Sequence, residues 1–215
     1  MAKLTGNLMQ DRQLLEKPLG VGRNFDVINR DIRVGGREGR LYVIDGYGDD
    51  AVIERTISFL LGEGAMLAAK AQSMRELSDT CVTFCEVNCE SEVEKILEGA
   101  FLGKTVLLLE GFDECVLIDA KRFPSRSVEE PANGKVLRGS HDGFTETLVQ
   151  NPALLRRRVR SERLVLESHK LKNRSQTDVV IAYMDGLADE KLLRELREKL
   201  EKIDVGSVAM SQESV

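Results

Sequence analysis

Apolar and polar positions along the chain follow two different periods, and these periods predict a mixture of strands and helices. Short runs rich in β-branched residues, separated by glycine-containing turns, predict two β-hairpins in the first half of the chain. We expect these hairpins to pair 25–34 with 41–44 and 105–109 with 114–118. A further strand is expected at 81–87.

Apolar residues three or four positions apart predict helices between and after these strands. The expected helices are 49–61, 66–77, a helix capped by Ser91 that ends near 101, 144–159 and 189–203. Two strands, 164–167 and 178–184, are expected before the last helix. That helix carries an apolar stripe made of Leu192, Leu193, Leu196, Leu200 and Ile203.

The order of these elements predicts an α/β fold made of two small α/β subdomains joined by a linker that contains Pro and Gly. The stretch 122–143 is too long for an ordinary connection, which is why we interpret it as a linker or an ordered crossing between lobes. The expected boundaries are an N-terminal lead-in, helical or disordered, at 1–22, a first subdomain at 23–124, the linker at 125–143 and a second subdomain at 144–215.

Composition and charge restrict the classes of function. The net charge of −5 argues against a protein that coats nucleic acid, so we expect no nucleic-acid partner. No stretch reaches the about 18 consecutive apolar residues that a spanning helix needs. The N-terminus mixes Asp11, Arg12 and Glu16 with apolar residues and shows no secretory signal. We therefore expect this chain by itself to be cytosolic, with its four cysteines as free thiols.

A glycine-containing turn at 46–51 has the spacing G-x-G-x-x-A between an expected strand and an expected helix. This is the context of a dinucleotide fingerprint. However, Asp49 and Asp50 fall where a pyrophosphate would sit, and like charges repel there. We favour a tight turn before a helix with a negatively charged first turn, and keep a soluble nucleotide- or small-molecule-binding α/β protein as the alternative.

Cysteines recur four residues apart at Cys81, Cys85 and Cys89. On one strand this spacing would place them on one face, and Cys115 is a candidate fourth ligand for a metal. The C-x-x-C spacing of a zinc knuckle is missing, so we favour buried structural thiols and expect no metal site.

Ser140, His141 and Asp142 are the residue types of a catalytic triad, but consecutive residues cannot point at one another as a triad requires. We interpret Asp142 as the N-cap of the helix expected at 144–159. With no acid–base pair in evidence, we expect a protein that is not an enzyme, with no catalytic residues and no cofactor.

Arginines cluster beside that helix in an otherwise acidic chain: Arg156, Arg157, Arg158, Arg160 and Arg163. Two interpretations stay open. The cations suit the negative end of a helix dipole on a solvated helix end, or they form a partner-binding surface for an acidic protein or an anionic membrane. No aromatic residues interleave with the arginines, which disfavours nucleic acid.

Several segments together carry a family resemblance. Residues 138–148 contain Asp142, Gly143, Phe144 and Glu146, and are followed by Asn151 and the run 154–160. This order is similar to the R-G-x-x-D-G-F-x-E…N-x-x-L-x-R-R-R-I-R signature of the GerA family of spore germination proteins. The segments 174–189 and 123–131 resemble further motifs of that family, and 20–26 resembles the start of one of its branches.

The resemblance implies a cytosol-facing region with two α/β subdomains, followed in the full-length protein by a membrane bundle in the spore inner membrane. It implies a regulatory and assembly role beside germinant receptors and their ion channels. The implied partners are other germination-complex subunits and further copies of the chain in a homo-oligomer. We expect one motif to have a structural rather than a binding role. It consists of Asp142, Gly143, Phe144, Glu146 and Asn151.

Two departures from the family pattern are His141 and Pro152, which stand where the family often has other residues. Family members also continue beyond the position of Val215. The resemblance therefore implies that the second subdomain is incomplete in this chain, which is either a truncated reading frame or an excised piece.

Overall fold

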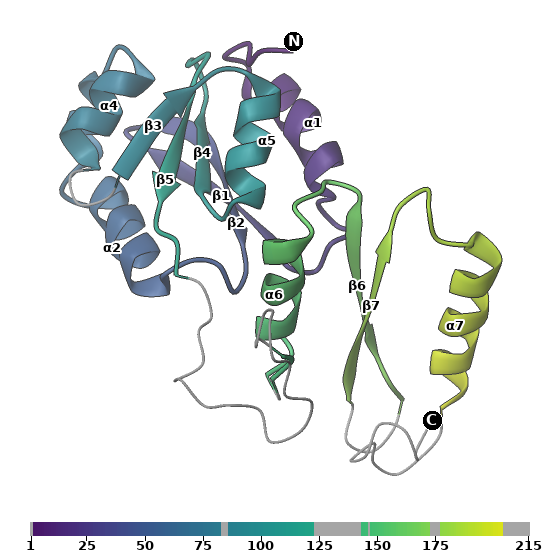
Figure 1. The fold of residues 1–215 in the computed structure, drawn as a ribbon. Coiled ribbons are helices and arrows are strands. Elements are labelled where there is room, and N and C mark those ends of the chain that lie inside the picture. Colours follow the sequence, from purple (N-terminus) through teal and green to yellow (C-terminus); the bar gives the residue numbers. More distant parts are fainter. Residues whose placement is uncertain (1, 83–85, 123–142, 146, 173–176, 204–215) are drawn as a thin grey trace, which may run out of the picture.

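The computed structural model describes residues 2–82, 86–122, 143–145, 147–172 and 177–203. These residues form two lobes, a five-stranded sheet covered by helices and a smaller lobe built on a two-stranded sheet (Figure 1). The α/β fold predicted from the sequence is confirmed. The linker expected at 125–143 lies almost entirely outside the described residues, as do Asp142 and Glu146.

The sheet of the first lobe has the strand order β1-β2-β4-β5-β3, and every neighbouring pair is antiparallel. Both predicted hairpins are present in it. Their strands are β1 (Val27–Val34) with β2 (Arg37–Ile44), and β4 (Thr105–Leu109) with β5 (Cys115–Asp119). The edge strand β3 spans Glu86–Glu90. All five residues of β4 are buried, as expected for a central strand covered on both faces.

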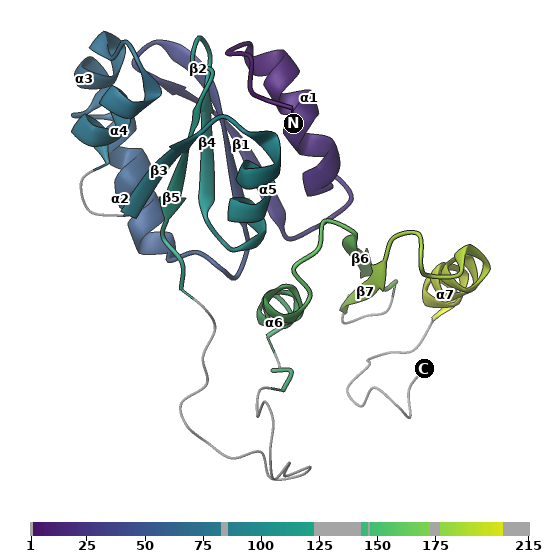
Figure 2. The same cartoon turned by 45° about the horizontal axis from the view of Figure 1, so that its top comes forward.

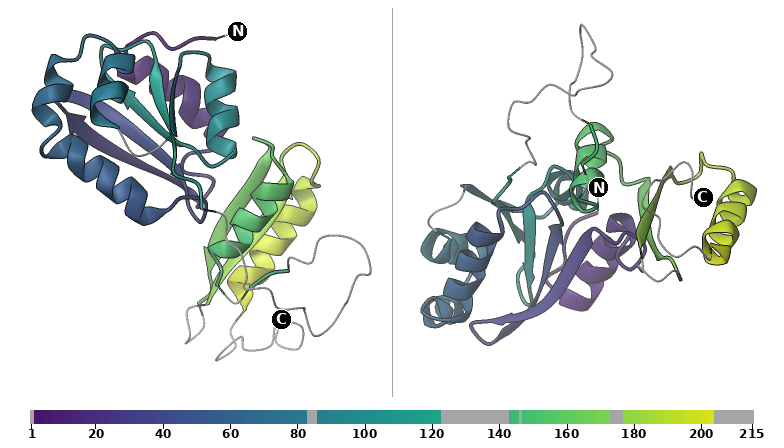
Figure 3. Two further views of the ribbon diagram at one scale, coloured as in Figure 1. Left: turned by 60° about the vertical axis from the view of Figure 1, so that its left-hand side comes forward. Right: turned by 90° about the horizontal axis from the view of Figure 1, so that it is seen from below.

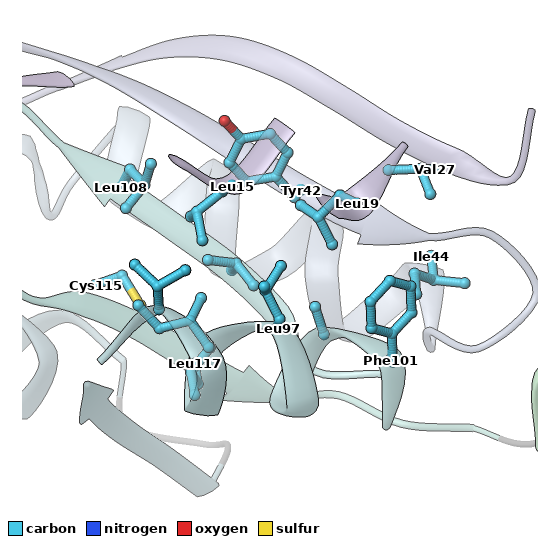
Figure 4. Close-up of a cluster of buried hydrophobic side chains, with 14 of the residues drawn as sticks. Leu15, Leu19, Val27, Tyr42, Ile44, Leu97, Phe101, Leu108, Cys115 and Leu117 are labelled. Atoms are coloured by element: carbon cyan, nitrogen blue, oxygen red, sulfur yellow. The ribbon is translucent and has the colours of Figure 1, made fainter. Parts of the chain in front are cut away.

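Helices cover both faces of this sheet (Figure 2). One face packs against α1 (Leu8–Leu19) and α5 (Val93–Phe101), with a buried cluster that includes Leu15, Leu97 and Phe101 (Figure 4). The other face packs against α2 (Asp50–Leu61), α3 (Ala65–Lys70) and α4 (Met74–Cys81). The lobe therefore has the three layers of a helix-covered sheet.

The N-terminal segment is helical, as one of the two expected alternatives stated, and α1 contributes to the core. Its residues Leu15 and Leu19 are almost fully buried against the sheet. The buried carboxylate of Asp11 accepts hydrogen bonds from the backbone N–H groups of Thr5 (2.8 Å) and Gly6 (3.0 Å). These bonds tie the residues before α1 to the lobe. The expected boundary at residue 22 itself stays a prediction.

Three local predictions in the first lobe are wrong. Cys81 ends α4 and the next strand begins only at Glu86, so Cys81 and Cys89 do not share one strand face. Cys85 lies outside the described residues. Two helices, α3 and α4, replace the single helix expected at 66–77.

The third error concerns the start of α5, whose N-cap is Glu92 rather than Ser91. Ser91 is held differently, because its carbonyl accepts the backbone N–H of Leu4 and its own N–H binds the Glu90 carboxylate. Cys89 and Cys115 pack into clusters on opposite faces of the sheet. Within the described residues, no group of three or more His, Cys, Asp or Glu side chains could hold a metal ion.

The second lobe consists of α6 (Gln150–Arg158), β6 (Leu164–Lys170), β7 (Asp178–Met184) and α7 (Glu190–Lys202) (Figure 3). Both strands agree with the sequence pattern and pair antiparallel. The helix expected at 144–159 begins only at Gln150, because the Asn151 side chain binds the backbone N–H and C=O of Thr145 and holds that segment in a turn. No helix among the described residues is long and apolar enough to cross a membrane.

The apolar stripe of α7 is only partly covered. Leu193 is buried, whereas Leu192 and Leu196 are 55% and 39% exposed. Leu200 and Ile203 are half-buried, so Leu193 is the one residue of the stripe that is fully buried.

Replacing Asp11 with alanine tests the role of the N-terminal segment. We expect the free energy of unfolding to fall by about 1–3 kcal/mol, because two backbone donors lose their acceptor. Gln13→Ala, at an exposed position of the same helix, is the control and should change stability by less than about 0.5 kcal/mol. Denaturant titration measures both. Equal effects would contradict a structural role for Asp11.

Candidate functional site at the junction of the lobes

The two lobes meet at the short segment Arg23–Asp26, which links α1 to β1 and which we call the junction segment. Each of its four residues contacts the second lobe, three through their side chains and Phe25 through its backbone N–H. Together they contact α6, β6 and the residue that follows β7. Figure 1 shows this junction where β6 and α6 approach the lower end of the first lobe. Contacts of this density fix the relative orientation of the lobes.

The central interaction is an ion pair between Asp26 and Arg156 of α6. Asp26 accepts hydrogen bonds from Nε of Arg156 and from its Nη2, the latter at 2.8 Å. Both side chains are only 1% exposed. The guanidinium also lies over the ring of Phe101 in α5, with Cζ 5.6 Å from the ring centre. Such a buried, bidentate pair is costly to break on one side, because the remaining charge stays desolvated.

The middle of the junction segment pairs with β6 almost as a strand would. The side-chain amide of Asn24 accepts the backbone N–H of Leu166 at 3.0 Å and donates to the carbonyl of Leu19 at 3.0 Å. The backbone N–H of Phe25 donates to the carbonyl of Leu166 at 3.1 Å. Asn24 is buried, so one side chain connects α1, the junction segment and β6.

Arg23 extends the junction to the end of β7. Its two Nη atoms donate to the Asp185 carboxylate at 2.9 and 3.0 Å, and its guanidinium lies over the Tyr183 ring. The hydrogen bonds from Arg23 hold the pKa of Asp185 below its usual value. On the neighbouring strand β6, Glu167 accepts two hydrogen bonds from Arg197 of α7, which lower the pKa of the Glu167 carboxyl group in the same way.

The glycine turn after β2 also belongs to the junction. Gly46 has a φ of 78°, and a Cβ there would lie 3.0 Å from the carbonyl oxygen of Val149 and 3.1 Å from Cβ of Ala153. Glycine is therefore needed so that α6 can approach the turn. The neighbouring Tyr47 is buried, and burial raises its pKa to about 12.

The first turn of α2, after Gly48, is already capped. The Asp49 carboxylate accepts the backbone N–H groups of Ala51 at 3.1 Å and Val52 at 3.3 Å. A pyrophosphate at this helix N-terminus would compete with that carboxylate. The arrangement matches the tight, negatively capped turn favoured from the sequence and gives no support to a nucleotide site.

The structure divides the arginine cluster predicted as a partner-binding surface. Arg156 is buried in the ion pair with Asp26, so including it in an exposed contact surface was wrong. Arg157, Arg158 and Arg160 are exposed. Arg163 is exposed as well, but its guanidinium donates to the carbonyl of Asp185 at 2.7 and 2.9 Å.

The predicted structural motif is only partly described. Asn151 holds Thr145, as noted above, while Gly143 and Phe144 are exposed. Gly143 and Phe144 also line a pocket of about 280 Å³ together with Leu154, Leu155 and Arg158.

Sequence reasoning missed the junction segment as a site. The spacing along the helix indicated that Arg156 faces inward. It lies three positions after Ala153 and four after Pro152, on the same helix face, and both of these residues are buried. An arginine on the buried face of a short helix requires a partner, because a buried charge without one is unstable. Nothing local identified Asp26 as that partner, since the two residues are 130 positions apart.

Comparison with known proteins identifies the family. The model of the Bacillus/Clostridium GerA spore germination proteins matches residues 13–215. The chain belongs to the GerA family. This chain is 30% identical to stage V sporulation protein AF of Bacillus subtilis. The matched region covers 97% of this chain and 42% of that protein. The chain is 27% identical to spore germination protein KA of the same organism, over 93% of its length and 37% of that protein.

The fold has a counterpart among solved structures. The N-terminal domain of the A subunit of the Bacillus megaterium spore germinant receptor GerK3 matches with a TM-score of 0.72 and 23% identity, over 94% of this GerA-family chain and 74% of that one. The chain spans less than half the length of the two curated relatives described above. The resemblance predicted from the motifs is thereby confirmed, including the similarity to the branch of stage V sporulation protein AF.

Breaking the buried ion pair tests the energetics of the junction. Asp26→Ala and Arg156→Ala should each lower the free energy of unfolding by about 3–5 kcal/mol, because each leaves the other charge buried without its partner. The double variant should lose less than the sum of the two single losses. Denaturant unfolding of all four proteins gives the coupling energy.

The matched control is Arg33→Ala, which removes an exposed ion pair with Glu38 and should cost less than about 1 kcal/mol. If Arg33→Ala and Arg156→Ala were equally destabilising, or if the two junction losses were additive, the pair would not hold the lobes together.

The Gly46 turn offers a second test of the junction. Gly46 and Gly22 have nearly the same backbone conformation, with φ of 78° and 81°, so Gly46→Ala and Gly22→Ala introduce similar backbone strain. A Cβ at Gly22, however, would meet no atom within 4 Å. We expect both variants to lose about 1 kcal/mol from the backbone, and Gly46→Ala to lose about 1–3 kcal/mol more because α6 must move. Thermal unfolding compares them, and similar losses would argue against close packing of α6 on the turn.

Proposed function

We propose that this chain is a regulatory and assembly domain of a membrane-bound spore germination protein, and that it acts by contact rather than by bond-breaking chemistry. Membership of the GerA family supports the biological process, since its relatives include spore germination proteins. The single structural observation that carries the proposal is the buried Asp26–Arg156 pair, which gives two lobes one defined relative orientation.

Such a domain can transmit a signal only if its lobes have two arrangements that differ in free energy by a small amount. A ligand or partner then shifts the balance in proportion to its difference in affinity for the two arrangements. The junction segment is suited to this role because each of its four residues makes a contact with the second lobe. Loss of the ion pair would favour an alternative arrangement.

In this proposal the domain faces the cytosol at the spore inner membrane and works beside an ion-channel complex. Its partners are other germination-complex subunits and further copies of the same chain in a homo-oligomer. An anionic membrane surface is a further candidate partner. The resemblance to the GerA family supports each of these assignments.

The proposed contact surface consists of Arg157, Arg158 and Arg160, the exposed part of the arginine cluster. Arg157 and Arg158 end α6, and Arg160 follows it; the Nε atom of Arg160 donates to the carbonyl of Arg157 at 3.3 Å. Arginine is favoured at protein interfaces and forms strong paired hydrogen bonds with carboxylates and phosphates. The surface therefore suits an acidic partner.

Charge reversal in spores tests the proposal. Spores whose sole copy of the gene encodes Arg157→Glu, Arg158→Glu and Arg160→Glu should germinate more slowly, because the contact surface becomes repulsive to its partner, while the purified domain keeps its unfolding midpoint. Loss of absorbance during germination measures the response.

The control variant carries Arg30→Glu, Arg33→Glu and Arg75→Glu, which change the net charge equally at exposed positions of the first lobe. It should germinate at the wild-type rate. Normal germination of the first variant, or equal impairment of both, would rule out the assigned surface.

A further inference from the structure

A groove with a volume of about 340 Å³ lies between the two lobes. One face of α5 forms its first wall, and Arg160 and Glu162, from the segment between α6 and β6, form the second wall. Figures 1 and 2 show the C-terminal end of α5 beside this segment. Because its walls belong to different lobes, the width of the groove depends on how the lobes are placed relative to one another.

The floor of the groove is apolar and continuous with the core of the first lobe. It consists of Leu97, Phe101 and Leu102. Leu97 and Phe101 are only 8% and 7% exposed, and Leu102 is half-buried at the end of α5. The ring of Phe101 also contacts the guanidinium of Arg156, as described above. A side chain bound on this floor would therefore lie next to the residues that hold the lobes together.

The rim of the groove is acidic. Glu94 and Glu98 are exposed on α5, and Glu162 is exposed on the opposite wall. Their three carboxylates make no hydrogen bond or ion pair with any residue that the structure describes. Arg160 is the basic residue of the lining, and its Nε atom donates to the carbonyl of Arg157. The lining therefore carries more negative than positive charge.

Other carboxylates on the surface of this chain are paired. Glu38 lies 3.0 Å from Arg33, and Glu92 lies 3.1 Å from Lys95. Lys95 is on α5 itself, three positions before Glu98, and this spacing would allow the two to pair. Lys95 binds Glu92 instead. The groove thus has negative charges beside apolar side chains that the fold itself does not use.

An apolar floor inside an acidic rim is complementary to a bulky apolar side chain flanked by positive charges. Burial of the apolar side chain would provide affinity, and the charges would provide attraction and orientation. The row from Glu94 to Leu102 extends about 12 Å along α5, which matches two turns of a partner helix. Helices that dock into grooves use anchor residues at this spacing. The length is more than a single cation would occupy.

A second copy of the chain fits the groove less well. The chain has a net charge of −5, so two copies repel each other at a distance, whereas a basic partner is attracted. In addition, Arg160 itself lines the groove. A two-fold contact between copies would bring the two Arg160 side chains toward each other. The charges therefore favour a basic segment of another protein.

We propose that this groove is the docking site of a basic segment of another protein. One bulky apolar side chain of that segment packs on Phe101 and its apolar neighbours, and its Lys or Arg side chains pair with the glutamates of the rim. Because the segment contacts both lobes, it favours the lobe arrangement that the Asp26–Arg156 pair holds. This contact goes beyond the proposed function, since it is opposite in charge to the arginine surface of α6.

Selection from a random peptide library displayed on phage, with the purified chain as the target, tests the chemistry of the occupant. We expect the selected peptides to share an aliphatic or aromatic residue flanked by Lys or Arg. The synthetic consensus peptide is then titrated by calorimetry. Replacing its apolar residue with Ser, or its flanking basic residues with Gln, should each weaken binding at least roughly tenfold.

Two triple variants of the chain show whether the peptide uses the groove. Replacement of the rim glutamates (Glu94→Gln, Glu98→Gln and Glu162→Gln) should weaken binding of the consensus peptide at least roughly tenfold. The matched control carries Glu63→Gln, Glu195→Gln and Glu198→Gln, which are exposed, do not line the groove and change the net charge equally. It should bind with wild-type affinity. Both variants should keep the wild-type unfolding midpoint.

Nuclear magnetic resonance tests the contact with both lobes. Addition of the consensus peptide should shift the backbone amide signals of α5 and of residues 160–162 together, and both sets should saturate at one peptide per chain. Shifts confined to α5 would show that the second lobe takes no part in binding, and would overturn the proposal.

Four further results would also overturn it. The first is a set of selected peptides without the basic and apolar pattern, and the second is equal affinity of the two triple variants. The third is spermidine binding as tightly as the peptide, because a small polyamine would then be the occupant. The fourth is a dimer in sedimentation that the rim variant dissociates, because a second copy would then occupy the groove. The arginines of α6 are unchanged in every one of these proteins, so failure here is distinguishable from failure of the proposed function.

Discussion

The ion pair between Asp26 and Arg156 is the constraint on which the arrangement of this protein depends. It joins residues 130 positions apart, one at the entrance to the main sheet and one on a short helix of the second lobe. Because the pair is buried, each charge has lost its hydration and is compensated only by the other charge. Separating the two residues would therefore cost much free energy. The packing of α6 on Gly46 and the pairing of Asn24 and Phe25 with β6 all require the same placement of the lobes.

The sequence predicted most strands well, because each has a local signature. The hairpins β1-β2 and β4-β5 carry β-branched runs around glycine turns, and Asp178–Met184 is a long apolar run. Errors arose where non-local contacts decide the structure. Ser91 does not cap α5 because its backbone bonds to the N-terminal segment, and the helix expected from residue 144 is interrupted by the side chain of Asn151.

The candidate site was harder to predict than the fold. A run of arginines indicates a charged surface, and for Arg157, Arg158 and Arg160 the exposure agrees with that interpretation. Arg156 differs from them only by its position on the helix, and its partner lies in the other lobe. Family motifs located this region of the chain without showing which arginine faces inward.

The short length of α6 has a mechanical consequence. The helix spans Gln150–Arg158, little more than two turns, so Arg156 and its exposed neighbours Arg157 and Arg158 belong to one rigid piece. A displacement of Arg157 and Arg158 is therefore transmitted to the buried guanidinium of Arg156 through the helix itself, with no loop in between. A partner that binds the exposed arginines and displaces α6 would therefore also displace the Asp26–Arg156 ion pair between the two lobes.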